Sequence, residues 1–288
     1  KGKIVASQDY TAASYNGSLI EIAGEDASMT MESGNISAVR ETPDSNGQYG
    51  VGVTDGGDFT MTGGKIEAGW FAVAGNGNYK TQNSIINITD GELISTADYA
   101  VYLPQSGTTT ISGGKAYGAA GGVCIQRGTL NVEGTALITS KGTGSTGNWG
   151  DGTGGQAAAA VNIAAEYGDC TVNISGGKLT AEKNALIIKA DSTHKISFAI
   201  TGGKFSSDVS GYLTGDYVQN ANGEGGKLEQ VAVAEVAAAD GSTTTKYASL
   251  TGAVNAAKDG ETVTLLKDVD LGSGYVNIAK KLTLDLNG

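Results

Sequence analysis

Cysteine, proline, histidine and aromatic residues are all scarce in this sequence. The 288 residues include two cysteines, two prolines and one histidine, and only 6% of them are aromatic. Two cysteines cannot make a disulfide framework. The repeat described below gives Cys124 and Cys170 opposite side-chain directions, so we expect two unpaired thiols. No run of about 18 apolar residues is present, so we expect no membrane insertion in this segment.

Positively charged residues are also few. The chain carries 19 lysines and arginines against 30 aspartates and glutamates, a formal net charge of -11, and its arginines are Arg40 and Arg127 alone. A protein that binds nucleic acid needs clustered cations to contact the phosphates. The charge balance therefore excludes nucleic acid as an expected partner.

Glycine, in contrast, is abundant, at 46 residues, and hydrophobic residues make up 39% of the chain. This composition is too apolar for a disordered chain and is typical of a turn-dense all-β protein. One pattern recurs along it: apolar, polar, apolar, polar, two small or glycine residues, often lysine, then apolar. Seven copies share an apolar column, which is occupied by Met31, Met61, Ile88, Ile111, Val132, Ile174 and Ile200.

The repeat predicts a parallel β-helix. Its copies are 21 to 42 residues apart, which excludes a rigid short-repeat solenoid and suits coils whose loops vary in length. Alternation at period two places the apolar positions inside and the polar ones outside. The glycine pair allows the tight bend into the next strand. A second apolar run follows in most coils and predicts a second stacked strand; it contains the pairs Val51 and Val53, Phe71 and Val73, Tyr99 and Val101, Val123 and Ile125, Val161 and Ile163, and Leu186 and Ile188.

Two outward columns accompany the repeat. One is lysine-rich, with Lys65, Lys115, Lys178 and Lys204, and the other is polar, with Thr30, Thr60, Asn87, Thr110, Asn131 and Asn173. Flat arrays of this kind can bind ice or glycans, but the residues are mixed and the coils uneven. The favoured interpretation is a ladder of hydrogen-bonding side chains on a solvated sheet.

The C-terminal segment changes character. Between residues 247 and 258, Leu250, Ala253, Val254 and Ala257 fall on one helical face, and strand-like segments follow at residues 262–266, 276–278 and 282–286. An amphipathic helix in front of such strands predicts a cap over the open end of a β-helix. We therefore expect a β-helix over residues 1–225, a connecting strand or linker over 226–245, and a cap helix with the first strands of a second, truncated β-helix over 246–288. Residues 1–4 match the second half of a repeat, so we expect the chain to begin within a coil.

The repeated motif also carries a resemblance. Ile-Thr/Ser-Gly-Gly-Lys, as at residues 111–115 and 200–204, resembles the right-handed, pectate-lyase-like β-helix surface proteins of Gram-positive commensal bacteria. Residues 246–266 and 281–288 are similar to the helix-then-strand opening of modules in such proteins. The resemblance implies an all-β, right-handed parallel β-helix solenoid with irregular loops and a short amphipathic cap helix near the C-terminus. It specifies function poorly, because the superfamily mixes polysaccharide lyases, glycosidases and non-enzymatic adhesins.

The longest glycine-rich insertion, residues 141–156, holds the strongest candidates for ligand binding. Asn148, Trp149 and Asp151 lie within it, and Arg127 is expected near Asp151. An exposed tryptophan can stack on a sugar ring or anchor a partner, although Trp149 folding back over the side of the solenoid is the favoured alternative. His194 is expected to be an exposed loop residue.

Catalytic and metal sites are only weakly indicated. A lyase-like arginine with Ca²⁺ needs two or three carboxylates nearby, and no repeated acidic column accompanies Arg127. Asp55 and Asp58 are weak Ca²⁺ candidates, because Asp-Gly is also ordinary turn chemistry. We therefore name no catalytic residue and expect no cofactor.

These observations favour a structural or adhesive module of an extracellular, cell-surface bacterial protein, anchored through regions outside this chain. We expect a non-enzymatic monomer that binds glycans or host or microbial surface proteins through its loops. The alternative is a polysaccharide-active enzyme, either a lyase or a glycoside hydrolase.

Overall fold

The computed structural model describes residues 2–5, 17–39, 49–76, 82–142, 158–188, 194–212, 217–219, 226–230, 232–247 and 249–287. The chain divides into two compact units. The first comprises Lys1–Leu213 and Gln219–Leu228, and the second comprises Thr214–Val218 and Glu229–Gly288. Each unit is described by itself.

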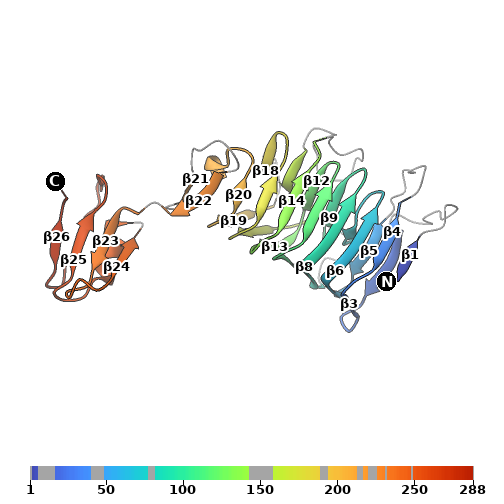
Figure 1. Cartoon of the computed structure of the whole chain (residues 1–288), viewed down its shortest axis with the longest axis horizontal. Coiled ribbons are helices and arrows are strands. Elements are labelled where there is room, and N and C mark those ends of the chain that lie inside the picture. The colour runs from blue at the N-terminus through green and yellow to red at the C-terminus, as the bar shows by residue number, and fades with distance from the viewer. Residues whose placement is uncertain are drawn as a thin grey trace. The chain divides into compact units, whose positions relative to one another are not determined.

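The first unit is an all-β parallel solenoid, which confirms the predicted fold class (Figure 1). Each coil runs through three faces, and the strands of each face stack in parallel on those of the neighbouring coils. The right-handed sense of the coils stays a prediction.

The first face consists of β3 (Ser28–Met31), the first parts of β6 (Asp58–Ala68) and β8 (Ser84–Ser95), β10 (Gly107–Ile111), β13 (Gly128–Val132), β16 (Cys170–Ile174) and β19 (Ile196–Ile200). The second face consists of β1 (Lys3–Val5), β4 (Asn35–Ala38), the second parts of β6 and β8, β11 (Lys115–Gly118), β14 (Leu137–Ser140), β17 (Lys178–Thr180) and β20 (Lys204–Phe205). The third face consists of β2 (Ser18–Ala23), β5 (Tyr49–Thr54), β7 (Val73–Ala74), β9 (Tyr99–Leu103), β12 (Gly121–Ile125), β15 (Ala159–Ile163) and β18 (Asn184–Ile188).

After β20 the chain forms a short 3-10 helix, η1 (Ser210–Tyr212), and then β21 (Tyr217–Gln219) and β22 (Gly226–Gln230). β22 pairs antiparallel with β20, in contrast to the parallel pairing between the coils.

The apolar column that defines the repeat forms the interior of the first face. Its seven residues are in continuous register from Met31 opposite Met61 to Ile174 opposite Ile200. Each is at most 5% exposed. The prediction that period-two alternation buries this column is confirmed, and the burial of such side chains between coils stabilises the stack.

The corner between the first and second faces depends on glycine. Gly114 has a φ of +67°, and a Cβ atom at this position would lie 2.7 Å from the carbonyl oxygen of Gly91 in the neighbouring coil. Only a residue without a side chain fits both the positive φ and this close approach.

The central strands of the third face, β5, β7, β9, β12 and β15, are buried on both sides, unlike the simple inside-outside alternation of the repeat. Val51, Val73 and Val101 continue the interior, whereas Phe71 and Tyr99 belong to a second cluster. That outer cluster contains Tyr49, Trp70, Phe71, Ala74, Tyr99, Tyr102, Ala120 and Cys124. Cys170 belongs to the interior and Cys124 to the outer cluster, so the two cysteines, which are not joined in a disulfide, point to opposite sides of the solenoid wall, as the repeat predicts.

The second unit is a small sheet covered by one helix. The strands run in the order β24 (Thr244–Tyr247), β23 (Ala234–Ala237), β25 (Thr262–Leu265) and β26 (Thr283–Asp285), and the β25–β26 pair is parallel. The predicted helix is present as α1 (Leu250–Ala256), whose Leu250, Ala253 and Val254 are buried. β23 and β24 pair with each other across the expected boundary at residue 245. That this unit opens a second β-helix stays a prediction.

Candidate functional site

An open groove of about 840 Å³ lies along the corner between the third and first faces. Its lining residues include Ile85, Thr108, Arg127, Thr129, Tyr167, Asp169 and His194. Ile85, Thr108 and Thr129 lie in register on the outer side of β8, β10 and β13 and form the floor. The other four come from the turns that lead into β13, β16 and β19.

The groove exists because successive corner turns differ in length. Two residues connect β12 to β13, whereas six connect β15 to β16. Strand pairing fixes the positions of the strands before and after each turn, so the extra residues of the longer turn must project outward from the surface of the solenoid. The longer turn therefore forms a wall beside the short turn that carries Arg127.

The turn of residues 164–169 is held by several backbone contacts. Ala165 adopts a φ of +47°, which is uncommon for a residue other than glycine and marks local strain. The amide of Tyr167 donates to the carbonyl of Gln126 at 3.1 Å, and the guanidinium of Arg127 donates through Nη1 to the carbonyl of Tyr167 at 3.3 Å. Gly168 has no side chain, and a Cβ atom there would lie 2.8 Å from Nε of Arg127. The turn and Arg127 thus position each other.

Asp169 and His194 connect this turn to the next coil. The carboxylate oxygen Oδ1 of Asp169 accepts a hydrogen bond from the amide of Lys195 at 3.0 Å. Nδ1 of His194 lies 3.0 Å from the carbonyl oxygen of Ala165. These contacts hold the exposed His194 beside the wall that carries Tyr167.

A buried polar network supports the wall from behind. The hydroxyl of Tyr102 donates to Oε1 of Gln126 at 2.9 Å. Burial raises the pKa of Tyr102 well above its usual value, and its neighbours Cys124 and Tyr167, the latter through a hydrogen bond, raise the pKa further. Tyr102 is therefore a neutral phenol, and it ties Tyr167 to the residue that precedes Arg127.

The site offers chemistry suited to a polar polymer. Arg127 is half-buried and has guanidinium N–H groups beyond the one bound to Tyr167, while Tyr167 as a residue is 36% exposed. A guanidinium binds a carboxylate through paired hydrogen bonds, and an aromatic ring packs against the apolar face of a sugar. The hydroxyls of Thr108 and Thr129 add donors and acceptors along the floor.

The structure places the predicted site residues unequally. Arg127 lies in the groove, whereas Asn148, Trp149 and Asp151 lie outside the described residues, so their association with Arg127 stays a prediction. His194 is exposed, as expected, but it shares the groove with Arg127.

Sequence reasoning missed Tyr167 and Asp169. The signal that could have found them is the turn before the repeat copy at residues 172–179. Cys170 is in register with Gly128, so Asp169 takes the place that Arg127 has one coil earlier, and Tyr167 lies two residues before Asp169.

The weak Ca²⁺ candidates are not among the residues that line the groove, although Asp58 pairs with Ile85 of its floor. Asp55 has a φ of +51° in a turn closed by a hydrogen bond from the amide of Gly57 to the carbonyl of Thr54, and Asp58 begins β6. Within the described ranges, no three or more histidine, cysteine, aspartate or glutamate side chains are grouped so that they could hold a metal ion.

The polar column of the first face is a hydrogen-bonded ladder. Nδ2 of Asn131 donates to the hydroxyl of Thr110 at 3.3 Å, and Nδ2 of Asn173 donates to Oδ1 of Asn131 at 2.9 Å. These side chains bind each other across strands, which is the structural role favoured from the sequence.

Comparisons with protein-family models, with curated proteins and with solved structures found no match to this chain. In the part of the chain that the structure describes, no helix has both the length and the apolar character needed to span a membrane.

Proposed function

We propose that this chain is a non-enzymatic, extracellular binding module that holds a carboxylate-bearing glycan in the groove beside Arg127. The observation that carries the proposal is the convergence of Arg127, Tyr167 and His194 on one groove whose floor is lined by threonine hydroxyls. The resemblance of the repeat to surface proteins of Gram-positive bacteria supports a place on the bacterial cell surface. Host or microbial glycans are then the expected ligands.

The arrangement favours binding over hydrolysis. Glycoside hydrolases use a pair of carboxyl groups that flank the scissile bond. Among the described lining residues, Asp169 supplies the one carboxylate, and its Oδ1 already accepts the amide of Lys195. A single, engaged carboxylate does not provide both the acid and the base of such a reaction.

A polysaccharide-active enzyme is the second candidate, and the shared groove of Arg127 and His194 is the observation that favours it. Both residue types can act on protons or on developing negative charge in a polysaccharide lyase or hydrolase. Incubation with acidic polysaccharides, with and without Ca²⁺, separates the two proposals. New unsaturated products or reducing ends would overturn the non-enzymatic one.

The binding proposal is tested on an array that presents carboxylated glycans next to their carboxyl-reduced counterparts. We expect the protein to bind the carboxylated members selectively. Tyr167→Ala should then lower the affinity about tenfold, because a central aromatic contact at an interface is worth about 1–2 kcal/mol.

Tyr275→Ala is the matched control, because Tyr275 is 84% exposed in the second unit and lies outside the groove. It should bind like the unchanged protein. Equal losses in the two variants, or equal binding of the carboxyl-reduced glycans, would contradict the proposed site.

A further inference from the structure

Gln126 joins the groove to the inner part of the solenoid wall, although it does not line the groove itself. This residue is 0% exposed and directly precedes Arg127. The amides of Gln126 and Arg127 both donate to the carbonyl of Leu103, at 2.8 Å and 3.2 Å. The carbonyl of Gln126 accepts a hydrogen bond from the amide of Tyr167 at 3.1 Å. The backbone of one buried residue thus holds Arg127 and Tyr167, which come from the turns of two successive coils.

The side chain of Gln126 is held by Tyr102, which lies on β9 of the preceding coil. The hydroxyl of Tyr102 donates to Oε1 of Gln126 at 2.9 Å, and the ring of Tyr102 stacks on that of Phe71 with an interplanar angle of 10°. Tyr102 is 8% exposed and does not line the groove. It can therefore influence a ligand only through the residues that it holds in place.

The hydrogen bond from Tyr102 does not depend on pH in the physiological range. Burial raises the pKa of the Tyr102 phenol well above its usual value, so the donor proton stays on the oxygen. The phenol also forms a hydrogen bond with the side chain of Tyr167. Two connections, one through Gln126 and one direct, thus join Tyr102 to the aromatic residue of the groove.

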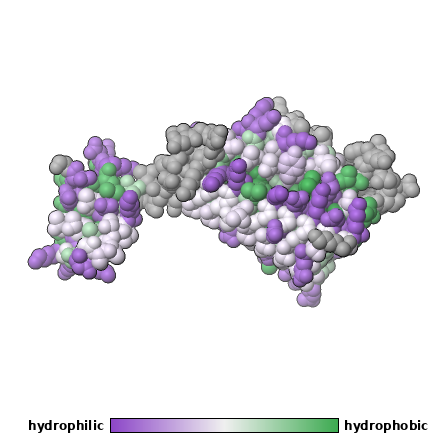
Figure 2. All heavy atoms as spheres, viewed as in Figure 1, coloured by the Kyte–Doolittle hydropathy of each residue, from purple (hydrophilic) through white to green (hydrophobic). Residues whose placement is uncertain are grey.

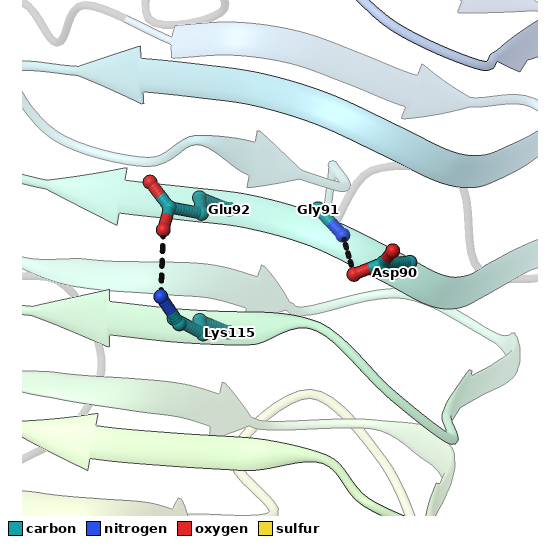
Figure 3. A network of polar contacts seen from close by, with 4 residues as sticks. All are labelled: Asp90, Gly91, Glu92 and Lys115. Carbon is teal, nitrogen blue, oxygen red and sulfur yellow. Dashed lines mark hydrogen bonds and ion pairs between the residues drawn. The ribbon is translucent and has the colours of Figure 1, made fainter.

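The polar contacts on the outside of the second face differ in kind. Nζ of Lys115 lies 2.8 Å from a carboxylate oxygen of Glu92, and the amide of Gly91 donates to Oδ1 of Asp90 at 2.7 Å (Figure 3). Both contacts are exposed, and on the face visible in Figure 2 hydrophilic residues and small apolar spots are interspersed over the first unit. Exposed ion pairs contribute little to stability because water screens the charges.

A buried hydrogen bond constrains its surroundings more strongly, because no water replaces a lost partner. Removing one side of such a bond leaves a polar atom unsatisfied in the interior. The bond from Tyr102 to Gln126 is of this kind, so any displacement of Gln126 is costly. The positions of Arg127 and Tyr167, which depend on the backbone of Gln126, are fixed by the same constraint.

We propose that Tyr102 is a positioning residue: through Gln126 it aligns the guanidinium of Arg127 with the ring of Tyr167, and this alignment determines the preference of the groove for carboxylated glycans. The inference rests on the proposed function and identifies what sets its selectivity. A guanidinium binds a carboxylate through paired hydrogen bonds of defined geometry, so its selectivity depends on alignment. Groups that are already aligned also lose less conformational entropy when a ligand binds.

The substitution Tyr102→Phe tests this role, because it removes the hydroxyl and keeps the ring that stacks on Phe71. Calorimetry with oligomers of glucuronate and of galacturonate should show an affinity about tenfold lower, which corresponds to the loss of one net buried hydrogen bond. The affinity for the carboxyl-reduced oligomers should fall less, because these make no paired contact with Arg127. The selectivity for the carboxylate should therefore fall.

Tyr99→Phe is the matched control. Tyr99 lies on the same strand and in the same outer cluster, is 2% exposed, and accepts a hydrogen bond from Nδ2 of Asn162 at 3.0 Å. Neither Tyr99 nor Asn162 lines the groove. The control should lose stability in denaturant unfolding, as Tyr102→Phe does, but keep the affinity and the selectivity. Equal losses of selectivity in the two variants would overturn the positioning role.

Amide hydrogen exchange measures the positioning in the protein without ligand. The amide of Tyr167 is bound to the carbonyl of Gln126, so its exchange requires that this contact opens. Tyr102→Phe should speed the exchange of this amide about tenfold relative to Tyr99→Phe. Exchange at Ser112, whose amide donates to the carbonyl of Ile88, should be the same in both variants. Equal exchange rates at Tyr167 in the two variants would contradict the inference.

A second substitution shows whether Tyr102 acts through Gln126. Gln126→Leu removes the same hydrogen bond from its other end and should lower the selectivity as Tyr102→Phe does. In the double variant Tyr102→Phe/Gln126→Leu the two losses should not add, because both act on one contact. Additive losses would overturn the connection through Gln126.

The outcomes separate this inference from the proposed function. Selective binding that Tyr102→Phe leaves unchanged would overturn the inference and leave the proposed function in place. Absence of binding by the unchanged protein would contradict the proposed function, and the exchange rate at Tyr167 would then still support or overturn the positioning role of Tyr102.

Discussion

The two isoleucines Ile88 and Ile85 test the period-two alternation on which the fold depends, because they lie on opposite sides of β8. Ile88 is 1% exposed and faces the interior, whereas Ile85 is 43% exposed on the outside. The substitutions Ile88→Ala and Ile85→Ala remove the same three carbon groups from the same strand. A difference in stability between the two variants therefore reports burial alone.

The expected magnitudes follow from the packing. Removing three buried carbon groups costs about 2.4 kcal/mol at about 0.8 kcal/mol each. Ile88 lies between Met61 and Ile111, in adjacent coils that the ladder holds in place, so the cavity cannot collapse. The total for Ile88→Ala should reach about 3–4 kcal/mol, within the range of about 2–5 kcal/mol for such changes. Ile85→Ala should cost about 1 kcal/mol or less.

Denaturant unfolding and amide hydrogen exchange together provide the assay. The amide of Ser112 donates to the carbonyl of Ile88 at 2.9 Å, so its exchange rate reports the junction between the two coils. We expect Ile88→Ala to lower the unfolding midpoint and to speed exchange at Ser112, with little change for Ile85→Ala. Equal costs for the two variants, or a cost below 1 kcal/mol for Ile88→Ala, would refute the assigned alternation.

Two further predictions concern a buried thiol and the helix of the second unit. Burial raises the pKa of Cys170 to about 12 from an ordinary value of 9.0, so the folded protein resists loss of this proton. The resulting stabilisation is fully present below pH 9 and is lost as the pH rises from 9 towards 12. Denaturant midpoints measured from pH 7 to 10.5 should therefore fall above pH 9 more steeply for the native sequence than for Cys170→Ala. Parallel pH dependences of the two midpoints would contradict this prediction. In the second unit, Nζ of Lys280 lies 2.5 Å from the carbonyl oxygen of Asn255 and 2.6 Å from that of Ala257 at the end of α1. Lys280→Met should therefore lower the stability of this unit by about 0.3–1 kcal/mol in a thermal melt. The control Lys267→Met should leave the stability unchanged. Equal melting temperatures of the two variants would show that Lys280 does not cap α1.

The sequence was sufficient to predict the strand register of the first face. The alternation around Met31, Met61 and Ile88 has one solution that keeps every apolar side chain inside, because a shift by one residue would turn the column outward. The glycine pairs mark the corner that follows. Register and corner are local properties of each repeat, so they can be read without knowing the loops.

The outer cluster of the third face could not be predicted by the same rule. Alternation assigns one side of a strand to solvent, but Tyr102 and Cys124 are buried on the outer side of β9 and β12. Phe71 and Tyr102 stack with ring centroids 4.5 Å apart. Strands buried on both sides have continuous apolar runs, and a short run of this kind does not tell which residue faces which side.

The candidate groove was harder to predict than the fold for a related reason. Arg127, Tyr167 and His194 are separated by 40 and 27 residues, and they meet only because parallel stacking returns the chain to the same corner once per coil. Which residues meet there depends on the exact turn that each coil uses, and turn length varies without disturbing the ladder. The glycine-rich insertion that stood out in the sequence lies largely outside the described residues, and three other turns, those that lead into β13, β16 and β19, supply the described site.

Because turn length can vary without disturbing the strand ladder, the strands determine stability and the corner turns determine which side chains line the groove. A substitution in the interior column changes the packing of the coils on both sides. A substitution at the corner affects mainly the backbone contacts of its own turn, such as the hydrogen bond from the amide of Tyr167 to the carbonyl of Gln126. A groove at the junction of a two-residue and a six-residue turn can therefore change its side chains at little cost in stability. Recognition at the corner should consequently be determined by the side-chain chemistry of the turns rather than by the strand ladder.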